Sequence, residues 1–241
     1  MKTITFPYIY SGYRTCQTYR DCFASIWKWH NQTLNIWTMI FSFFLGTFLY
    51  TAKVNGHNFL PMTVYYLGQA VHNPLSVCYH TFMPVNLIFW RTIDINAIVF
   101  MNLCASWAVI YSVAYNMTYD IINSLVIATY GTMSCLLISL ILILKKRNMS
   151  VHDRRSLMYP IITSALGYYV PLTISSMYST NIKDLITLPL LVIGQGTSIL
   201  IYVKHWPQCF YHGKFDCGFN SHVLMHILII ACYNSGYFYI C

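Results

Sequence analysis

Seven apolar stretches, each about as long as a bilayer-spanning helix, follow one another along this sequence. A transmembrane helix needs about 20 consecutive, mostly apolar residues. The spans that we expect are residues 34–52, 60–83, 93–115, 121–144, 157–177, 185–203 and 219–241. The pattern therefore predicts an all-α membrane protein, folded as a seven-transmembrane helix bundle.

The composition supports this class, and the length argues against an additional soluble domain. The chain has 241 residues, of which 57% are hydrophobic and 8% are charged, whereas soluble domains are usually about 25% charged. A soluble domain would need roughly 100 to 150 further residues. We expect a cytosolic segment over residues 1–33 and a transmembrane domain over 34–241. No cleavable signal peptide is expected, since the first 30 residues contain no continuous apolar run.

The lysine and arginine residues predict the orientation of the bundle. Of the 14, twelve fall in the amino-terminal segment or in the second, fourth and sixth connections, while Lys53 and Lys183 fall on the other side. Basic residues near span ends are retained in the cytoplasm. The amino terminus is therefore expected inside and the carboxyl terminus outside. The basic net charge is explained by the Lys and Arg residues that set the orientation of the bundle. We therefore expect no nucleic-acid partner.

The segment that precedes the first span has amphipathic character. Phe23, Ile26 and Trp27 recur at helical spacing beside Arg20 and Lys28. Such a pattern favours a helix lying in the inner headgroup layer of the membrane. The alternative is a disordered cytosolic tail.

Four ionisable residues fall at one inferred depth: His80, Asp94, His222 and His226. A lone histidine near a helix end is usually satisfied by a carbonyl or a water, and a histidine pair four residues apart also occurs by chance. The predicted topology, which was obtained without reference to histidine, places all four in the inner leaflet on three different spans. Ionisable groups at such positions usually mark function. The coincidence predicts a metal site held by His80, His222 and His226.

Zinc is the ion that best suits three neutral imidazoles in an apolar setting, although iron, copper and nickel remain alternatives. Three protein ligands leave a fourth position for water, whose pKa zinc can lower to about 7. Asp94 would hold that water or accept its proton, unless it pairs with Arg91 at the membrane surface. Ser76, one turn before His80, would orient the water or a substrate carbonyl, unless its hydroxyl bonds to its own helix.

Other sites are weaker candidates. A second zinc site is conceivable in the sixth connection, but its residues lack a CxxC pair; they are His205, Cys209, His212 and Cys217. The nine cysteines are scattered and suggest no disulfide framework. A pore or transporter would need polar residues along several spans, and the candidates identified here lie at one level.

Several blocks of the chain resemble the progestin and adipoQ receptor family. They are residues 11–14 (Ser-Gly-Tyr-Arg), residues 30–38 (His-Asn-Gln-Thr-Leu-Asn-Ile-Trp-Thr), Ser76 with His80, Asp94, residues 213–216 (Gly-Lys-Phe-Asp) and residues 221–226 (Ser-His-Val-Leu-Met-His). The resemblance covers nearly the whole chain. It implies seven spans, a cytosolic amino terminus, zinc at the three histidines and a water held by Asp94. The first block is similar to the membrane progestin receptor branch.

The chain departs from the family pattern at several positions. Gln32 stands where the family usually has Glu, and Met39, Ile95 and Val223 replace the usual His, Tyr and Gln. The interval between His80 and Asp94 is about three residues shorter than usual. None of these departures removes a proposed ligand, but the short interval affects the placement of Asp94.

The leading functional hypothesis is a zinc-dependent hydrolase of lipid amides, with a ceramide-like substrate that enters from the bilayer. The resemblance also extends to haemolysin III proteins and, in its site pattern, to alkaline ceramidases. The alternative is a receptor in which zinc is structural and the ligand is a steroid or an extracellular protein such as adiponectin. Expected partners are membrane lipids, including ceramide, steroid or free fatty acid. We expect a multi-pass protein of the plasma membrane, with internal membranes as the second choice.

Overall fold

The protein is described here from a computed structural model, which covers residues 6–118, 120–145, 161–167, 169–170, 173 and 182–240. All regular structure in these ranges is helical. A short α1 (Tyr19–Ala24) and the 3-10 turn η1 (Ser25–Trp27) precede the long helices. These are α2 (Thr33–Lys53), α3 (Phe59–Phe82), α4 (Leu87–Thr118), α5 (Ile121–Lys145), α7 (Ile182–Lys204) and α8 (Ser221–Ile240).

The six long helices coincide with six of the predicted spans. The remaining span, 157–177, lies mostly outside the described residues. Residues 161–167, which belong to this span and are described, are helical. Among the described residues, three helices have the length and hydropathy needed to cross a membrane, namely Thr33–Lys53, Leu87–Met117 and Ser221–Ile240. The chain is therefore a helical membrane protein. The number of spans and the side on which each terminus lies stay predictions.

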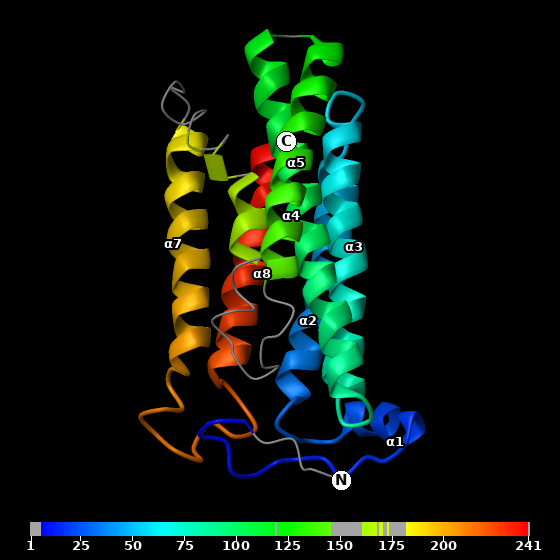
Figure 1. Ribbon diagram of the computed structural model, residues 1–241, viewed down its shortest axis with the longest axis vertical. Coiled ribbons are helices and arrows are strands. Elements are labelled where there is room, and N and C mark those ends of the chain that lie inside the picture. The colour runs from blue at the N-terminus through cyan, green and yellow to red at the C-terminus, as the bar shows by residue number, and fades with distance from the viewer. Residues whose placement is uncertain are drawn as a thin grey trace.

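The long helices run side by side along the longest axis of the molecule (Figure 1). The amino-terminal segment, the turn between α3 and α4 and the connection between α7 and α8 lie together at one end. Helix α8 runs from that end towards the other. Helix α2 packs against α3 and α8, α4 packs against α3 and α5, and α7 packs against α8. The arrangement brings α2, α3 and α8 together at the end that carries the amino-terminal segment.

Helix α4 begins earlier than the hydropathy pattern predicts, at Leu87 instead of residue 93. Arg91 and Asp94 lower the hydropathy of its first turns, but Asn86 provides a helix start. The Asn86 side chain accepts a hydrogen bond from the Phe89 amide at 3.1 Å, as an N-cap does. Asp94 consequently lies about two turns inside the helix and does not open it.

The segment with amphipathic character forms α1 and η1. Thr18 and Asp21 make a capping box at the start of α1. Phe23, Trp27 and Trp29 are exposed, and Trp27 is 76% accessible. Large aromatic side chains left open in this way suit a membrane interface. Contact of this segment with the inner headgroup layer stays a prediction.

Close packing between α3 and α8 requires a glycine at position 236. A Cβ atom there would lie 2.6 Å from Cζ of Tyr65 and would also meet its hydroxyl group. Tyr65 is held in place because its buried hydroxyl donates to the Tyr233 carbonyl at 2.6 Å. The ring therefore cannot move away without loss of that hydrogen bond.

We expect Gly236→Ala to destabilise the bundle by about 1 to 3 kcal/mol, the usual cost of overpacking a core. The measurement is thermal unfolding of the detergent-solubilised protein. Gly196→Ala is the matched control, since Gly196 lies in helix α7 and a Cβ there meets no atom within 4 Å. Alanine has the better helix propensity, so the control should be at least as stable as the parent chain. Equal melting temperatures for the two variants would contradict the packing argument.

Candidate metal centre

Three histidine side chains converge at the end of the bundle that carries the amino-terminal segment. His80 comes from the last turn of α3, and His222 and His226 come from the first two turns of α8. One ring nitrogen from each lies within 4.8 Å of the other two. The ring centroids are 4.8 Å apart for His80 and His222, 5.1 Å for His80 and His226, and 4.8 Å for the α8 pair. The predicted convergence of these residues is confirmed.

Hydrogen bonding from α2 orients the His80 ring. Its Nδ1 lies 2.9 Å from Gln32 Oε1. That oxygen also accepts a hydrogen bond from the side-chain amide of Asn35 at 2.9 Å. Because the Gln32 oxygen can only accept, Nδ1 must carry the proton. Nε2 then presents a lone pair. It is buried and has no partner in the part of the chain that the structure describes.

His226 is oriented in the same way by another side chain of α2. Its Nδ1 lies 3.2 Å from Thr38 Oγ1, whose own proton is donated to the Leu34 carbonyl at 2.7 Å. The Thr38 oxygen therefore accepts from Nδ1, which leaves Nε2 of His226 as the free lone pair. Two imidazoles from different helices are thus fixed in the tautomer that binds a metal through Nε2.

The donor set fits a transition-metal ion. Neutral imidazoles are ligands for zinc, copper, iron and nickel, and His80 Nε2 is a buried polar atom that lacks a partner among the described residues. Two nitrogens bound to tetrahedral zinc at 2.0 to 2.1 Å lie about 3.4 Å apart. The three nitrogens lie within 4.8 Å of one another here, so the widest pair would have to move up to about 1.4 Å closer together to share one ion.

A cavity of about 90 Å³ adjoins the histidine cluster. His222 and His226 line it, together with Ser76 of α3 and Asp94 of α4. The rest of the lining is mainly apolar and includes Met39, Ile95, Ile98, Ile199, Met225, Ile229 and Ile230. The cavity therefore combines an imidazole cluster, one carboxyl group and an apolar wall.

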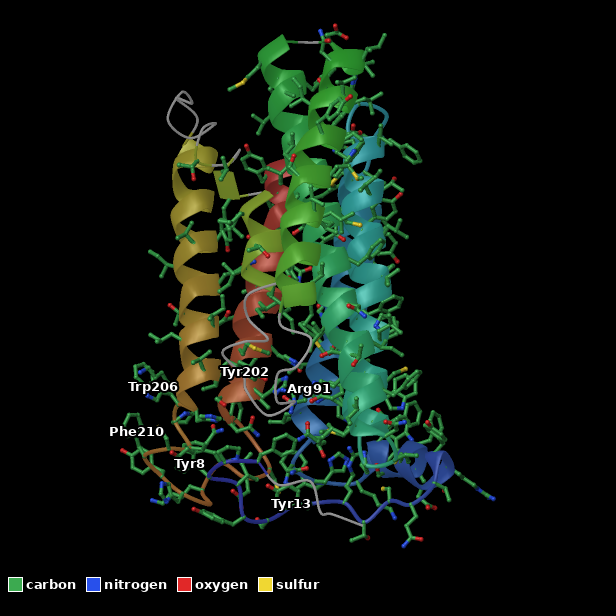
Figure 2. All side chains as sticks on the ribbon, in the orientation of Figure 1. Tyr8, Tyr13, Arg91, Tyr202, Trp206 and Phe210 are labelled. Carbon is green, nitrogen blue, oxygen red and sulfur yellow. The ribbon has the colours of Figure 1, made fainter. Side chains whose placement is uncertain are left out.

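Asp94 is 7% exposed and lies near the Ser76 side chain, within reach of its hydroxyl group. Its Oδ1 is buried without a hydrogen-bond partner among the described residues. Despite the short interval from His80, Asp94 thus faces the same cavity as His222 and His226. Arg91 lines this cavity too, and its charge acts on Asp94, so the pairing considered from the sequence stays open. Figure 2 shows Arg91 and Tyr202 at this end of the bundle.

The amino-terminal segment closes this end of the bundle, and sequence reasoning gave it no role at the site. The Arg14 guanidinium donates to the carbonyls of His80 and Thr81, at 2.5 and 3.1 Å, and to Ser25 Oγ at 2.8 Å. Burial lowers the pKa of Arg14 below its usual range. Arg14 thereby ties the segment to the last turn of α3, where His80 lies.

A second anchor fixes the segment to the connection between α7 and α8. Oδ2 of Asp216 accepts from the amides of Tyr10 and Ser11, at 3.1 and 2.7 Å, and from the Ser11 hydroxyl at 2.7 Å. Ser11, Arg14 and Asp216 belong to the blocks on which the resemblance was based. Through these contacts, the two blocks hold the amino-terminal segment against the end of the bundle where the histidine cluster lies.

The second zinc site considered in the sixth connection does not assemble. In the ranges that the structure describes, the histidine cluster is the one group of three or more candidate ligands close enough to share an ion. His205 and His212 instead pack against Tyr8, with ring centroids 5.8 and 5.0 Å apart. Figure 2 shows Tyr8 in the amino-terminal segment below the helices. These histidines help to hold that segment.

Removal of the Gln32 acceptor should weaken metal binding. We expect Gln32→Ala to lower the affinity about 10- to 100-fold, as is usual when a partner of a metal-binding histidine is lost. Gln32→Glu keeps an acceptor at the same place and should retain the metal. The measurement is competition of the purified protein with a fluorescent zinc chelator. An unchanged affinity in the alanine variant would show that Gln32 does not orient His80.

A bundle of apolar helices with a buried histidine cluster at one end defines a polytopic membrane protein with a candidate metal centre. The chain belongs to the haemolysin-III related family, whose family model matches residues 27–237. This family is that of the progestin and adipoQ receptors, so the predicted family is confirmed.

An uncharacterized protein of Schizosaccharomyces pombe is similar to this chain. The two are 28% identical over 241 residues, which cover 93% of this chain and 54% of the relative. The chain thus spans about half the length of this curated relative.

Proposed function

We propose that this protein is a seven-span zinc protein that hydrolyses the amide bond of a ceramide-like membrane lipid. The observation that carries the proposal is the placement of one carboxyl group, Asp94, on the same buried cavity as His222 and His226. A structural metal site needs no such cavity, whereas a hydrolytic site needs space for substrate beside the metal and the base.

Each group has a distinct part in the proposed reaction. His80, His222 and His226 would hold the ion, which when bound supplies a Lewis acid and makes water more acidic. Asp94 would accept the proton of the attacking water and return it to the leaving amine. Ser76, which lies near Asp94, would orient the carboxyl group by donating a hydrogen bond to it. The isoleucine and methionine side chains of the wall would bind the acyl chain and exclude water.

The test is a hydrolysis assay on the purified, zinc-loaded protein in detergent or nanodiscs. Ceramide and other long-chain lipid amides are supplied, and released sphingoid base and fatty acid are quantified by mass spectrometry. The expected result is release of both products in equal amounts. Failure to release either product, with zinc still bound, would contradict the hydrolase.

A receptor with a purely structural metal is the second candidate. The observation that favours it is the attachment of the amino-terminal segment to the His80 turn through Arg14. Metal at the cluster would join α3 to α8 and hold the amino-terminal segment against their ends. A shift of these helices on ligand binding would then move the segment on the cytosolic side. The hydrolase requires Asp94 for turnover, whereas the receptor does not require it for signalling.

The proposal includes an orientation in which the histidine cluster lies near the cytosolic face, with a plasma-membrane location favoured. The predicted excess of Lys and Arg on the side of the amino-terminal segment supports it. Protease protection of tags placed at each chain end is the test. Both tags in one compartment would contradict an odd number of spans.

A further inference from the structure

Buried polar side chains extend well beyond the histidine cluster. Helix α3 carries Gln69, His72 and Asn73 in addition to Ser76, and each of these is at most 5% exposed. The expectation that the polar residues of the spans lie at one level is therefore wrong. Of the residues added by the structure, His72 and Asn73 line the same cavity as the cluster.

His72 is the least explained of these residues. It is 5% exposed, and its Nδ1 is buried without a hydrogen-bond partner in the described parts of the chain. Its ring meets the Tyr233 ring edge-on, with centroids 6.4 Å apart and planes at 88°. An unpaired buried nitrogen costs free energy, so a partner from the cavity would stabilise the protein.

Tyr233, which faces His72, is held rigidly. Its hydroxyl donates to Asn102 Oδ1 at 2.9 Å. The Asn102 amide donates in turn to the Ile161 carbonyl and to Ser164 Oγ, at 3.1 and 3.0 Å. With its proton committed to Asn102, the Tyr233 oxygen keeps a lone pair for a further donor. Tyr233 lines the cavity as well.

The spacing of these residues along their helices gives the distance from the metal centre. His72 precedes His80 by eight residues on α3, which corresponds to about 12 Å along the axis. Tyr233 follows His226 by seven residues on α8, which corresponds to about 10 Å. The two helices therefore agree on a second polar position about 10 to 12 Å from the histidine cluster.

The chemistry of this position favours an uncharged group that both donates and accepts. The charged side chains that line the described cavity, Arg91 and Asp94, belong to the first turns of α4, near the metal centre. A charged ligand group beside His72 and Tyr233 would lack a counter-ion and would be costly to bury. A hydroxyl group can donate to the Tyr233 oxygen and accept from His72, or donate to His72 in the other tautomer.

We propose that His72 and Tyr233 form a second polar subsite of the cavity, which binds a hydroxyl group on the chain of the lipid about 10 to 12 Å from the carbonyl presented to the metal. This inference rests on the proposed function and specifies its substrate class. The preferred lipid is one with a hydroxyl group within its apolar chain, in addition to its polar head. His72 and Tyr233 would distinguish such lipids from unsubstituted ones.

The experiment measures binding without turnover. The probes are long-chain ketones, which present a carbonyl but have no amide bond to hydrolyse. One ketone is unsubstituted, one carries a hydroxyl about 11 Å from the carbonyl, and one carries it about 5 Å nearer. Binding to the zinc-loaded full chain is measured by equilibrium dialysis. The ketone with the distant hydroxyl should bind about tenfold more tightly than either of the others, as one additional buried hydrogen bond allows.

Substitutions at position 72 then assign the effect. In His72→Leu the tenfold ratio should fall to about one, while His72→Asn, which keeps a polar atom near the place of Nδ1, should restore part of it. Zinc content and melting temperature show whether each variant is folded. Should the leucine variant fail to fold, the comparison of the two hydroxyl positions in the parent chain still decides.

Three results would overturn the inference. Equal binding of the three ketones would exclude the subsite and leave the proposed lipid function standing. A tenfold preference that survives in folded His72→Leu would mean that other groups bind the hydroxyl and that an ordered water satisfies His72. Absence of binding by any ketone would overturn the lipid function itself, together with the subsite.

Discussion

His222→Ala should leave the purified protein with less than about one tenth of the metal that the parent chain binds. The parent chain is expected to hold one ion. The two remaining imidazoles come from separate helices, and loss of a direct ligand should cost at least as much as the 10- to 100-fold penalty for losing a ligand's partner. The measurement is elemental analysis of the detergent-solubilised chain after exhaustive dialysis.

The matched control for this variant is His212→Ala. His212 is exposed in the connection between α7 and α8 and lies outside the cluster. The substitution removes one histidine from the same part of the chain. Because this histidine lies outside the cluster, metal content should stay at the parent level. Equal metal content in both variants, with both folded, would mean that the ion is held elsewhere or bound non-specifically.

The three candidate ligands were identifiable from the sequence for physical reasons. A spacing of four residues places His222 and His226 on one face of a helix whatever the rest of the fold does. The distribution of Lys and Arg then placed His80 at the same end of the bundle. Helix periodicity is a local property, and the distribution of basic residues concerns whole connections between spans. Both can be recognised in the sequence without knowledge of tertiary contacts.

The residues that orient these ligands could not be found in this way. Gln32 lies 48 positions from His80, and Thr38 lies 188 positions from His226. Side-chain contacts at such separations depend on how α2 packs against α3 and α8, which no local pattern specifies. The resemblance marked residues 30–38 as a block without stating what they touch.

Polar residues within the spans were missed for a related reason. A hydropathy window averages about 19 residues and so conceals one histidine or asparagine among apolar neighbours. His72 and Asn102 therefore contribute nothing visible to their span signals, although both line the cavity. Averaging has the opposite effect at the start of α4, where two charged residues close together, Arg91 and Asp94, lower the mean hydropathy although the helix has already begun.

Asp94→Asn separates the hydrolase from the receptor. In the hydrolase, the amide cannot accept a proton, and we expect kcat for the lipid amide to fall about 10²- to 10⁴-fold, the usual contribution of a general base. Zinc content should stay near the parent level, because the metal ligands are the three histidines. The nearby Ser76 hydroxyl can donate to the amide oxygen as it can to a carboxylate, so the local fold should persist.

The control is Asp21→Asn, which makes the same chemical change at the capping box of α1, away from the cavity. Its loss is limited to a helix cap, and turnover should stay within about twofold of the parent chain, since exposed substitutions usually have small effects. In the receptor, Asp94→Asn should retain zinc and leave signalling unaffected. Full hydrolytic activity in Asp94→Asn would contradict the role of Asp94 as the base and leave the histidine cluster as a metal centre whose proton acceptor lies elsewhere.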